Sequence, residues 1–520
     1  MKGRSLPLLQ FAKGFNAMML SCVLLLFAAG CSEDKEAPPV FKPIDLNLFS
    51  QTHKGFNLLG KFDAGWSNTG FSEKEFEIIK DLGFNFARLP LDYRTYTKAG
   101  NWNEFSEGCS EIDDAVEWGR KYGVHVCICL HRAPGYCVNK TILPANQDLD
   151  LWTDPVARAA FVKHWEFFAE RYRNVPWTDL SFNLVNEPGD VDESTYFSVM
   201  KMAIDRIRQI NPDRIIFVDG LNIGRDLVPS FRGMKNIIQA IHVYDPVTLT
   251  HYRADWIPGS DSWPLPVWPM TDISWYLYGP VKPEYSSSLI FEGNFPGGTE
   301  ITVNVHQVSV RSTLQIRLDE NEVYKKVFIC GPDPGDDWTR IIETQWGYQN
   351  ISGKDYTAVL PSGGTRLAFS NTDGDWLTVN KITIRFGATD SIVIIPANTT
   401  WGARQNTYRI TTERKITDTG GNPVVALSSL NNALKMAGEE NIPVMVQEFG
   451  VFNKTPHSVA LAYLSDVVSI LNRNKTGYAM WNLIGTMGII NSGRFDCSYE
   501  EYRGMLLDRE MTTVIQKPDR

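Results

Sequence analysis

Eight short apolar segments, separated by longer amphipathic ones, constrain the fold of this 520-residue chain more than any other feature. Most of them are continuously apolar rather than alternating, as expected for strands of a parallel sheet that helices cover on both faces. These strand candidates are residues 56–60, 84–90, 125–131, 180–188, 214–220, 237–245, 443–450 and 478–483. Stretches with the 3.6-residue periodicity of helices lie between them, at residues 110–123, 154–173, 193–210 and 458–474. Eight strands that alternate with helices predict a (β/α)8 barrel, an α/β fold.

The alternation stops between the sixth and seventh strand candidates. From residue 284 to residue 390 the chain is of β type, with hairpin signals such as "PSGG" and "NTDGD" and no helix of ordinary length. We therefore predict an all-β sandwich over 284–390, inserted between strands six and seven, because a loop whose ends lie close together accepts an insertion with little disturbance. The barrel would then consist of residues 47–283 and 391–520. Residues 391–424 are ambiguous, and one interpretation is that they add strands packed on the barrel before the sixth helix resumes near Ala426.

The first 46 residues are predicted to export and anchor the protein. Within residues 1–30, a lipoprotein signal peptide by this interpretation, three basic residues precede an apolar run that ends in small residues directly before Cys31. The run is shorter than the ~20 apolar residues of a membrane-spanning helix, and it resembles a bacterial lipoprotein cleavage site, where the cysteine receives the lipid. The acidic "SEDKE" after Cys31 resembles the export signal of Bacteroidetes surface lipoproteins, and residues 31–46 form a predicted tether. We expect an exported protein, lipid-anchored in the outer membrane at the bacterial cell surface, with plain secretion as the alternative.

Charge and cysteine usage argue against several function classes. The formal net charge of −9 disfavours a nucleic-acid partner, because nucleic acid binds clustered positive charge. Cys127 and Cys129 alternate within one strand candidate and are expected in the core, and the other cysteines beyond the export segment show no metal-ligand spacing. The chain carries no phosphate-loop or dinucleotide fingerprint. We therefore predict no nucleic-acid binding and assign neither a disulfide nor a zinc site.

Polar side chains end nearly every strand candidate. In a (β/α)8 barrel the active site lies at the carboxyl ends of the strands, so these side chains would face a common cleft. They are Arg88, His131, Asn186, Glu187, His242, Tyr244, Glu448 and Trp481. Glu187 closes the fourth strand and Glu448 the seventh, so the two carboxylates would point at one another across the ring. Two opposed carboxylates suit the cleavage of a glycosidic bond, because one protonates the leaving oxygen while the other attacks or supports the anomeric carbon.

The motifs that carry these residues resemble glycoside hydrolase family 5, in the clan of β-retaining barrel enzymes. "FNLVNEP" and "VMVQEFG" look like its acid/base and nucleophile strands. Further matches in the barrel portions are "FARLP", "LHRAPGY", "IHVYD", "AMWNL" and "GIINSGRFD". The resemblance implies that Glu187 is the acid/base and Glu448 the nucleophile.

The resemblance also implies roles for the other side chains of the site. Arg88 would support the nucleophile, Tyr244 would hydrogen-bond it, and His242 would lie between the two glutamates. Asn186 and His131 would bind sugar hydroxyls, with Asn186 holding the 2-hydroxyl.

Tryptophans are the natural sugar platforms, because aromatic rings stack on the apolar faces of sugars. The resemblance assigns Trp481 to the −1 subsite. Trp66, Trp263 and Trp268 lie in loops after strands one and six, so we consider them candidates for outer subsites.

The insert resembles a galactose-binding-like β-sandwich at "NTDGDWLTVNKITI". Trp346 and Trp376 are its aromatic candidates for a ligand, and either could instead fill its own core. Carbohydrate binding and a structural spacer role both stay open for this segment.

The activity implied by the resemblance is that of a retaining glycoside hydrolase, an endoglucanase-like enzyme that cleaves plant-type β-1,4-glucan. Glu448 would attack as a carboxylate while protonated Glu187 donates to the leaving oxygen, and Glu187 would then act as base toward water. The alternatives are a mannan- or xyloglucan-directed endo-β-glycanase of the same family and a non-catalytic surface glycan-binding protein, which the retention of both glutamates disfavours. No metal or organic cofactor is expected, because two carboxylates and water suffice, although calcium in the insert is left open.

Overall fold

The computed structural model describes residues 43–139 and 149–516. The predicted signal peptide, Cys31 and most of the predicted tether therefore lie outside the described residues. The chain divides into two units, Met1–Ile44 and Asp45–Arg520, and the elements below belong to the second. Within the described ranges, no helix combines the length and the apolar character needed to cross a membrane.

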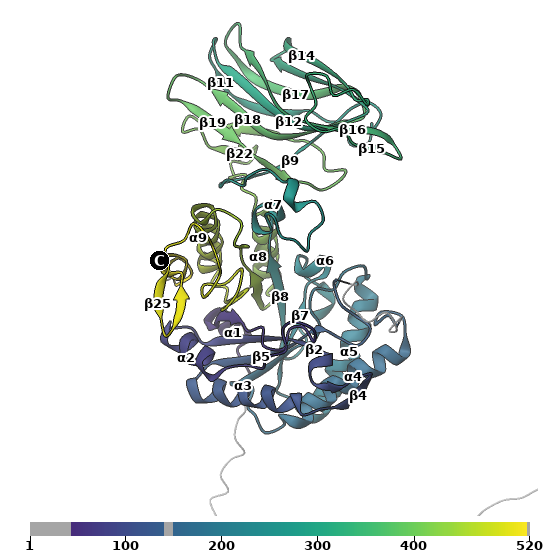
Figure 1. The fold of residues 1–520 in the computed structure, drawn as a ribbon, viewed down its shortest axis with the longest axis vertical. Helices are drawn as coiled ribbons and strands as arrows, with labels where there is room; N and C mark the ends of the chain where they lie inside the picture. Colours follow the sequence, from purple (N-terminus) through teal and green to yellow (C-terminus); the bar gives the residue numbers. More distant parts are fainter. Residues whose placement is uncertain (1–42, 140–148, 517–520) are drawn as a thin grey trace, which may run out of the picture. The chain divides into compact units, whose positions relative to one another are not determined.

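Eight parallel strands close into a barrel in the order β1-β2-β5-β6-β7-β8-β23-β24 (Figure 1). They are β1 (Lys54–Asn57), β2 (Phe86–Asp92), β5 (His125–Arg132), β6 (Leu180–Asn183), β7 (Ile215–Asp219), β8 (Ile237–Val243), β23 (Val444–Phe449) and β24 (Tyr478–Met480). β2, β5 and β8 are buried along their whole length, which explains why their sequences are mainly apolar and do not alternate with solvent-facing polar residues. The predicted α/β barrel with a β-rich region outside it is confirmed.

Helices precede, separate and follow the barrel strands and cover the outside of the barrel (Figure 1). They are α1 (Leu46–Thr52), α2 (Glu73–Asp81), α3 (Gly108–Tyr122), α4 (Pro155–Arg171), α5 (Glu193–Ile210), α6 (Leu221–Gly224), α7 (Val247–Thr250), α8 (Ser428–Glu440), α9 (His457–Arg473) and α10 (Arg509–Ile515). Local sequence sets their ends: the Asp154 side chain accepts from the Val156 amide and Pro155 opens α4, whereas α3 stops at Gly123 in the left-handed region, with φ +66°. After β7 only the one-turn α6 and a 3-10 turn (Pro229–Phe231) precede β8, so no full-length helix follows the fifth strand.

Two sheets outside the barrel share one hydrophobic core and form a β-sandwich. The first, in the order β10-β18-β12-β16-β15 with β19 on β18, comprises β10 (Tyr276–Tyr278), β12 (Glu300–Ser309), β15 (Glu343–Thr344), β16 (Gly347–Val359), β18 (Trp376–Arg385) and β19 (Ser391–Ile394). The second, in the order β14-β13-β17-β11-β21-β22, comprises β11 (Leu289–Phe295), β13 (Arg311–Leu318), β14 (Asn321–Ile329), β17 (Gly364–Gly374), β21 (Thr407–Ile410) and β22 (Ile416–Asp418). In chain order, all of these strands fall between β8 and β23.

The sandwich is larger than the predicted segment 284–390. β10 pairs with β18 ahead of the predicted start, and β19, β21 and β22 pair with sandwich strands beyond the predicted end. Residues 391–424 therefore do contribute strands, but these three join the sandwich and not the barrel. The alternating burial of Ser391–Ile394 suits a strand with one covered face.

A separate parallel pair, β9 (Thr271–Ser274) and β20 (Pro396–Asn398), joins the two chain segments that lead into and out of the sandwich. We call this pair the stalk. Two further small sheets are β3 (Thr97–Lys98) with β4 (Asn101–Phe105), and β25 (Glu500–Tyr502) with β26 (Met505–Leu507). The six cysteines of the described residues are free, and Cys127 and Cys129 are fully buried in β5.

Candidate active site

The carboxyl ends of the barrel strands bring the predicted site residues together. Arg88 comes from β2, His131 from β5, Asn186 and Glu187 from the segment directly after β6, His242 from the end of β8, Tyr244 from directly after it, Glu448 from β23, and Trp481 from directly after β24. This convergence follows from the parallel barrel, in which all strands end at the same face.

Glu187 and Glu448 face each other across the site, with His242 between them. One carboxylate oxygen of each glutamate and a ring nitrogen of His242 lie within 4.8 Å of one another. Nδ1 of His242 lies 2.9 Å from Oε1 of Glu187 and 3.7 Å from Oε2 of Glu448. The two side chains differ in access to solvent, since that of Glu187 is 12% exposed and that of Glu448 4%.

Both oxygens of Glu448 are held by donors. Nη1 of Arg88 donates to Oε1 at 2.5 Å, and the Tyr244 hydroxyl donates to Oε2 at 3.1 Å. Burial raises the pKa of Glu448 above its ordinary value, while the positive charges of His242 and Arg88 oppose that rise. Burial acts to lower the pKa of Arg88, but Cys129, Glu448 and Asp219 around it raise the pKa above its ordinary value, so the guanidinium stays cationic.

Arg88 also connects Glu448 to a buried amide network. Its guanidinium donates to the side-chain oxygens of Asn57 at 2.9 Å, Asn183 at 2.9 Å and Asn186 at 2.7 Å. Asn183 in turn donates to Oδ1 of Asp219 at 2.7 Å. Since each of these groups is buried, the network fixes the guanidinium in one orientation.

The backbone leaves the extended conformation where Glu187 stands. β6 ends at Asn183, and Glu187 has φ +50°, in the left-handed region that non-glycine residues rarely adopt. Two buried partners hold it there: Oδ2 of Asp219 accepts from the Glu187 amide at 2.9 Å, and the Tyr136 hydroxyl donates to the Glu187 carbonyl at 2.6 Å. The strained turn directs the Glu187 side chain toward His242.

His242 stands among three carboxylates. Besides the two glutamates, Oδ2 of Asp219 lies 3.3 Å from its Nε2, within ion-pair distance but outside hydrogen-bond geometry. Burial acts to lower the pKa of His242, but the charges of Glu448, Asp219 and Glu187 outweigh it and raise the pKa above its ordinary value. The imidazole therefore tends to carry a proton between the two glutamates.

Besides Nε2 of His242, two buried nitrogens of the predicted site residues have no hydrogen-bond partner among the described residues. They are Nδ2 of Asn186, whose Oδ1 accepts from Arg88, and Nδ1 of His131. Buried polar atoms are nearly always paired, so unpaired ones beside a cleft mark positions where a ligand hydroxyl would be bound. The His131 ring lies 5.4 Å from that of Trp481, and both contact Phe62, at 4.6 Å and 5.2 Å between ring centroids.

Sequence reasoning missed Asp219, Asn183 and Asn57. Asp219 ends the strand candidate 214–220, so the rule that found the other residues could have found it. Asn57 ends β1, which stops three residues before the predicted strand end. Asn183 lay inside the apolar run 180–188, where nothing in the sequence distinguishes it from a core position.

The predicted outer-subsite tryptophans occupy different environments. Trp66 is 68% exposed, and its ring lies 5.4 Å from Phe62 beside Trp481. Trp263, at the end of a 3-10 turn, is half-buried. The indole of Trp268 instead donates to Asp466 at 2.8 Å and packs on Tyr463, both on α9, so the structure assigns it to packing on that helix. Trp268 was expected at an outer subsite but packs on α9, because the path of its long loop depends on contacts that are distant in the sequence.

Two exposed aromatic rings near the strand ends were not predicted. Trp256, in the loop after α7, is 48% exposed and packs edge-on against Phe452. Phe495, after β24, is 79% exposed. Both belong to loops whose apolar residues are too isolated to show a pattern in the sequence.

Two clusters in the described part of the chain have ligand atoms close enough to hold a metal ion. The first is Glu187, His242 and Glu448, where the cationic Arg88 already neutralises Glu448 and so disfavours a second cation. The second is His457, Cys497 and Asp508, in which Asp508 accepts from His457 at 2.8 Å and also caps α10. The second cluster joins α9 to α10, because His457 begins α9 and Asp508 caps α10.

Comparisons with known proteins concern the barrel part of the chain. Residues 47–265 match the family model for cellulase, glycosyl hydrolase family 5. Endoglucanase C of Acetivibrio thermocellus is 32% identical over 196 residues, which make up 36% of this chain and 54% of that protein. Cellodextrinase A of Ruminococcus flavefaciens is 28% identical over 190 residues, covering 36% of this chain and 55% of that protein. The chain thus spans about half the length of these curated relatives.

A crystal structure described as that of a glycoside hydrolase shares the fold. It has a TM-score of 0.55 and 23% sequence identity, and the match covers 89% of this chain and 98% of that one. Glu187 and His242 lie inside the segment that matches the family model, whereas Glu448 lies on β23, which closes the same barrel. The resemblance expected from the motifs is confirmed: residues 47–265 match the model of glycosyl hydrolase family 5, and they supply six of the eight strands of the parallel barrel.

Proposed function

We propose that this chain is a retaining glycoside hydrolase that cleaves β-1,4-linked glucan by double displacement. The observation that carries the proposal is the separation of Glu187 and Glu448, whose nearest oxygens lie within 4.8 Å at the carboxyl ends of β6 and β23. Carboxyl groups about 5–5.5 Å apart act through a covalent intermediate, whereas a gap of ~6.5–9.5 Å admits a water and inverts the configuration. The short separation favours retention.

Glu448 is the better candidate for the nucleophile. It accepts from Arg88 and from Tyr244, and both donors favour the carboxylate over the neutral acid. The same two contacts limit its motion, so one oxygen would be held ready for the anomeric carbon.

Glu187 is the better candidate for the acid/base. It is the more exposed of the two, and its His242 contact can pass or hold a proton. In the first step Glu448 would form a bond to the anomeric carbon while the bond to the leaving oxygen breaks and Glu187 gives that oxygen its proton. In the second step Glu187 would take a proton from water, whose oxygen replaces Glu448 at the same carbon.

The unpaired donors fit a sugar in the −1 position. Nδ2 of Asn186 and the His131 ring would donate to sugar hydroxyls, which satisfies both groups. Trp481 would stack on the ring, and Trp66 would extend the platform outward.

The preference for β-1,4-glucan is supported by the relatives, two of which carry the names endoglucanase and cellodextrinase. Mannan and xyloglucan remain alternative substrates of the same chemistry. Hydrolysis of carboxymethyl-cellulose, mixed-linkage glucan, xyloglucan and glucomannan should be compared, and we expect the highest kcat/KM on the unbranched glucans. No hydrolysis of any of the four would favour a glycan-binding protein.

The stereochemistry of the first product tests the mechanism. Proton NMR of a cellooligosaccharide digest should show the β-anomer first, followed by slow mutarotation to the α-anomer. Early appearance of the α-anomer would rule out double displacement at Glu187 and Glu448.

We also propose that the protein is exported and lipid-anchored through Cys31, which lies outside the described residues. The apolar run that ends in small residues before this cysteine supports the proposal. Expression of the unmutated chain with labelled palmitate should yield a labelled mature protein, whereas a Cys31→Ala variant should stay unlabelled. No labelling of the unmutated protein would favour plain secretion, and equal labelling of both proteins would contradict acylation at Cys31.

A further inference from the structure

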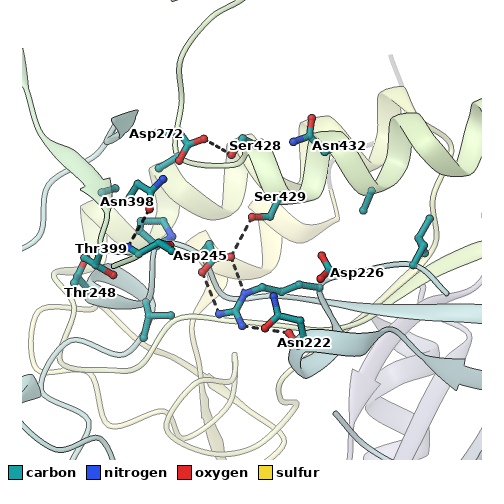
Figure 2. Close-up of a pocket in the computed structure, with 18 of the residues that line it drawn as sticks. Asn222, Asp226, Asp245, Thr248, Asp272, Asn398, Thr399, Ser428, Ser429 and Asn432 are labelled. Carbon is teal, nitrogen blue, oxygen red and sulfur yellow. Dashed lines mark hydrogen bonds and ion pairs between the residues drawn. The ribbon is translucent and has the colours of Figure 1, made fainter. Parts of the chain in front are cut away.

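A cavity lies near the catalytic centre, and neither Glu187 nor Glu448 is among the residues that line it. It has a volume of about 720 Å³, within the range of ligand pockets. The loops after β7 and β8 form one wall, α8 forms another, and the stalk and the turn after it form the third (Figure 2). One wall of the pocket is therefore made by the insert, which a family 5 barrel does not require.

The side chains that line the pocket are mostly polar and include donors and acceptors. Oγ1 of Thr248 is buried and has no hydrogen-bond partner among the described residues. Asn398 uses its side-chain oxygen to accept from the Thr400 amide, which leaves its amide nitrogen for the pocket. Asn432 projects from the exposed side of α8 at the rim, and Ser429 lies on the same helix next to Asp245 (Figure 2).

The walls are fixed by hydrogen bonds between the stalk and the start of α8. The Ala426 amide donates to the Met270 carbonyl at 3.0 Å, and the Ser428 hydroxyl donates to Asp272. The Thr271 amide donates to the Ile395 carbonyl at 2.8 Å, which ties the two stalk strands together. The pocket is thus preformed, which lowers the entropy that a ligand loses on binding.

An ion pair separates the pocket from the catalytic centre. Arg225 donates from Nε to Oδ2 of Asp245 at 3.0 Å and from Nη2 to Oδ1 at 3.2 Å. Asp245 directly follows Tyr244, which contacts Glu448, and the Arg225 loop contacts Pro188 next to Glu187 through the Ile223 amide. Residues that line the pocket are therefore direct chain neighbours of residues that contact Glu448 and Pro188.

We propose that this pocket is a second glycan subsite, which takes a neutral pyranose unit through hydrogen bonds to its hydroxyls. The proposal rests on the proposed function, since it assigns the pocket to the same class of polysaccharide. Each sugar hydroxyl both donates and accepts, and the lining offers amides, hydroxyls and carboxylates for both. The ligand is either a further unit of the chain bound at Glu187 and Glu448 or a separate glycan.

Charge argues against other ligands. Asp226, Asp245 and Asp272 in the lining repel phosphate and other anions, and the single arginine is already paired with Asp245. A divalent cation is disfavoured as well, because the clusters of the described residues whose ligand atoms converge lie elsewhere. A neutral polyhydroxylated ligand meets neither objection.

Filling the pocket from its rim tests the proposal. Asn432→Trp places an indole at the mouth from an exposed helix position, and Asn431→Trp is the matched control, because Asn431 is exposed on the same helix and does not line the pocket. Both are made in the full chain with Glu448→Gln, and binding of cellotriose and cellohexaose is measured by calorimetry. We expect Asn432→Trp to weaken cellohexaose binding about tenfold relative to the control.

A gentler variant keeps the shape of the pocket. Thr248→Val removes a hydroxyl that has no internal partner, so the fold loses no hydrogen bond. We expect a loss of affinity of about threefold to tenfold with an unchanged melting temperature, as for one neutral hydrogen bond to a ligand.

The two oligosaccharides distinguish the sources of the ligand. If the pocket continues the substrate chain, Asn432→Trp weakens only cellohexaose; if it holds a separate glycan, the control binds two cellotriose molecules and Asn432→Trp binds one. The proposal would be overturned if the Asn432→Trp and Asn431→Trp variants gave equal binding isotherms with both oligosaccharides. It would also be overturned if neither variant bound either oligosaccharide. Hydrolysis by the unmutated protein is measured separately, so failure of the proposed function is seen independently.

Discussion

The barrel and the sandwich place their polar side chains in opposite ways. At one end of the barrel, Asn57, Arg88, Asn183, Asp219 and Glu448 are buried and bonded to one another. In the sandwich, strands such as β12 and β13 largely alternate buried apolar residues with more exposed polar ones. This pattern is expected because one face of each sheet packs on the other sheet and the opposite face contacts solvent. Burying charge is unfavourable unless it is paired, so the barrel holds a network that folding alone does not need. The difference indicates which region carries chemistry.

The largest expected effect follows from removing the proposed nucleophile. Glu448→Gln keeps the size of the side chain and one oxygen that can accept from Arg88, while its amide NH2 would face the Tyr244 hydroxyl, but it cannot form the covalent intermediate. We expect kcat to fall on the order of 10⁴ to 10⁶-fold, as when a nucleophile is removed from other enzymes. Retained cellooligosaccharide binding and circular dichroism are the controls, and near-normal turnover would show that the buried network is not catalytic.

Removal of the proposed acid should depend on the leaving group. Glu187→Ala is expected to lower hydrolysis of glucan by about 10² to 10⁴-fold, the usual contribution of general acid catalysis. Formation of the intermediate from an aryl cellobioside, whose phenolate needs no proton, should be affected much less in pre-steady-state measurements. Equal losses on both substrates would contradict the assignment.

Asp219 links the two halves of the network and should have an intermediate effect. Asp219→Asn disturbs its bonds to Asn183 and the Glu187 amide and its charge near His242, so we expect kcat to fall about 10 to 100-fold, as when a group that orients a catalytic residue is lost.

The stability of the same variant should depend on pH through His242. Burial lowers the pKa of His242 but three carboxylates raise it above the ordinary value, so its protonation stabilises the fold fully below about pH 6.5 and this contribution disappears as pH rises through the raised pKa. Asp219→Asn removes one of these charges. Urea unfolding should therefore show a larger loss of stability at about pH 6 than at alkaline pH, and a loss independent of pH would exclude the coupling.

The smallest effect is expected in the sandwich. Trp346 is 72% exposed between β15 and β16, so Trp346→Ala should change the free energy of unfolding by no more than about 0.5 kcal/mol. If the sandwich binds carbohydrate through this ring, adsorption to insoluble cellulose should weaken about threefold while oligosaccharide turnover stays the same. Unchanged adsorption would leave the sandwich a structural role. Trp376→Phe is the comparison, because Trp376 is buried among other rings.

The same contrast explains how much the sequence could predict. Glu187 and Glu448 could be found because each interrupts an apolar run at the end of a strand, where a core residue would otherwise stand. Asn183 could not, since its partner Asp219 lies 36 residues away and only the closed barrel brings them together. The bounds of the sandwich were missed because short strands such as β10 are defined by their pairing with β18. The position of Trp268 was missed because the residue that it contacts on α9 is distant in the chain.

Trapping of the covalent intermediate tests the central claim most directly. A 2-deoxy-2-fluoro cellobioside with a good leaving group should inactivate the protein, and mass spectrometry of its peptides should place one added disaccharide on Glu448. Label on another residue, or turnover with no labelled species and an α-configured first product, would contradict an account in which Glu187 and Glu448 act on the same sugar ring.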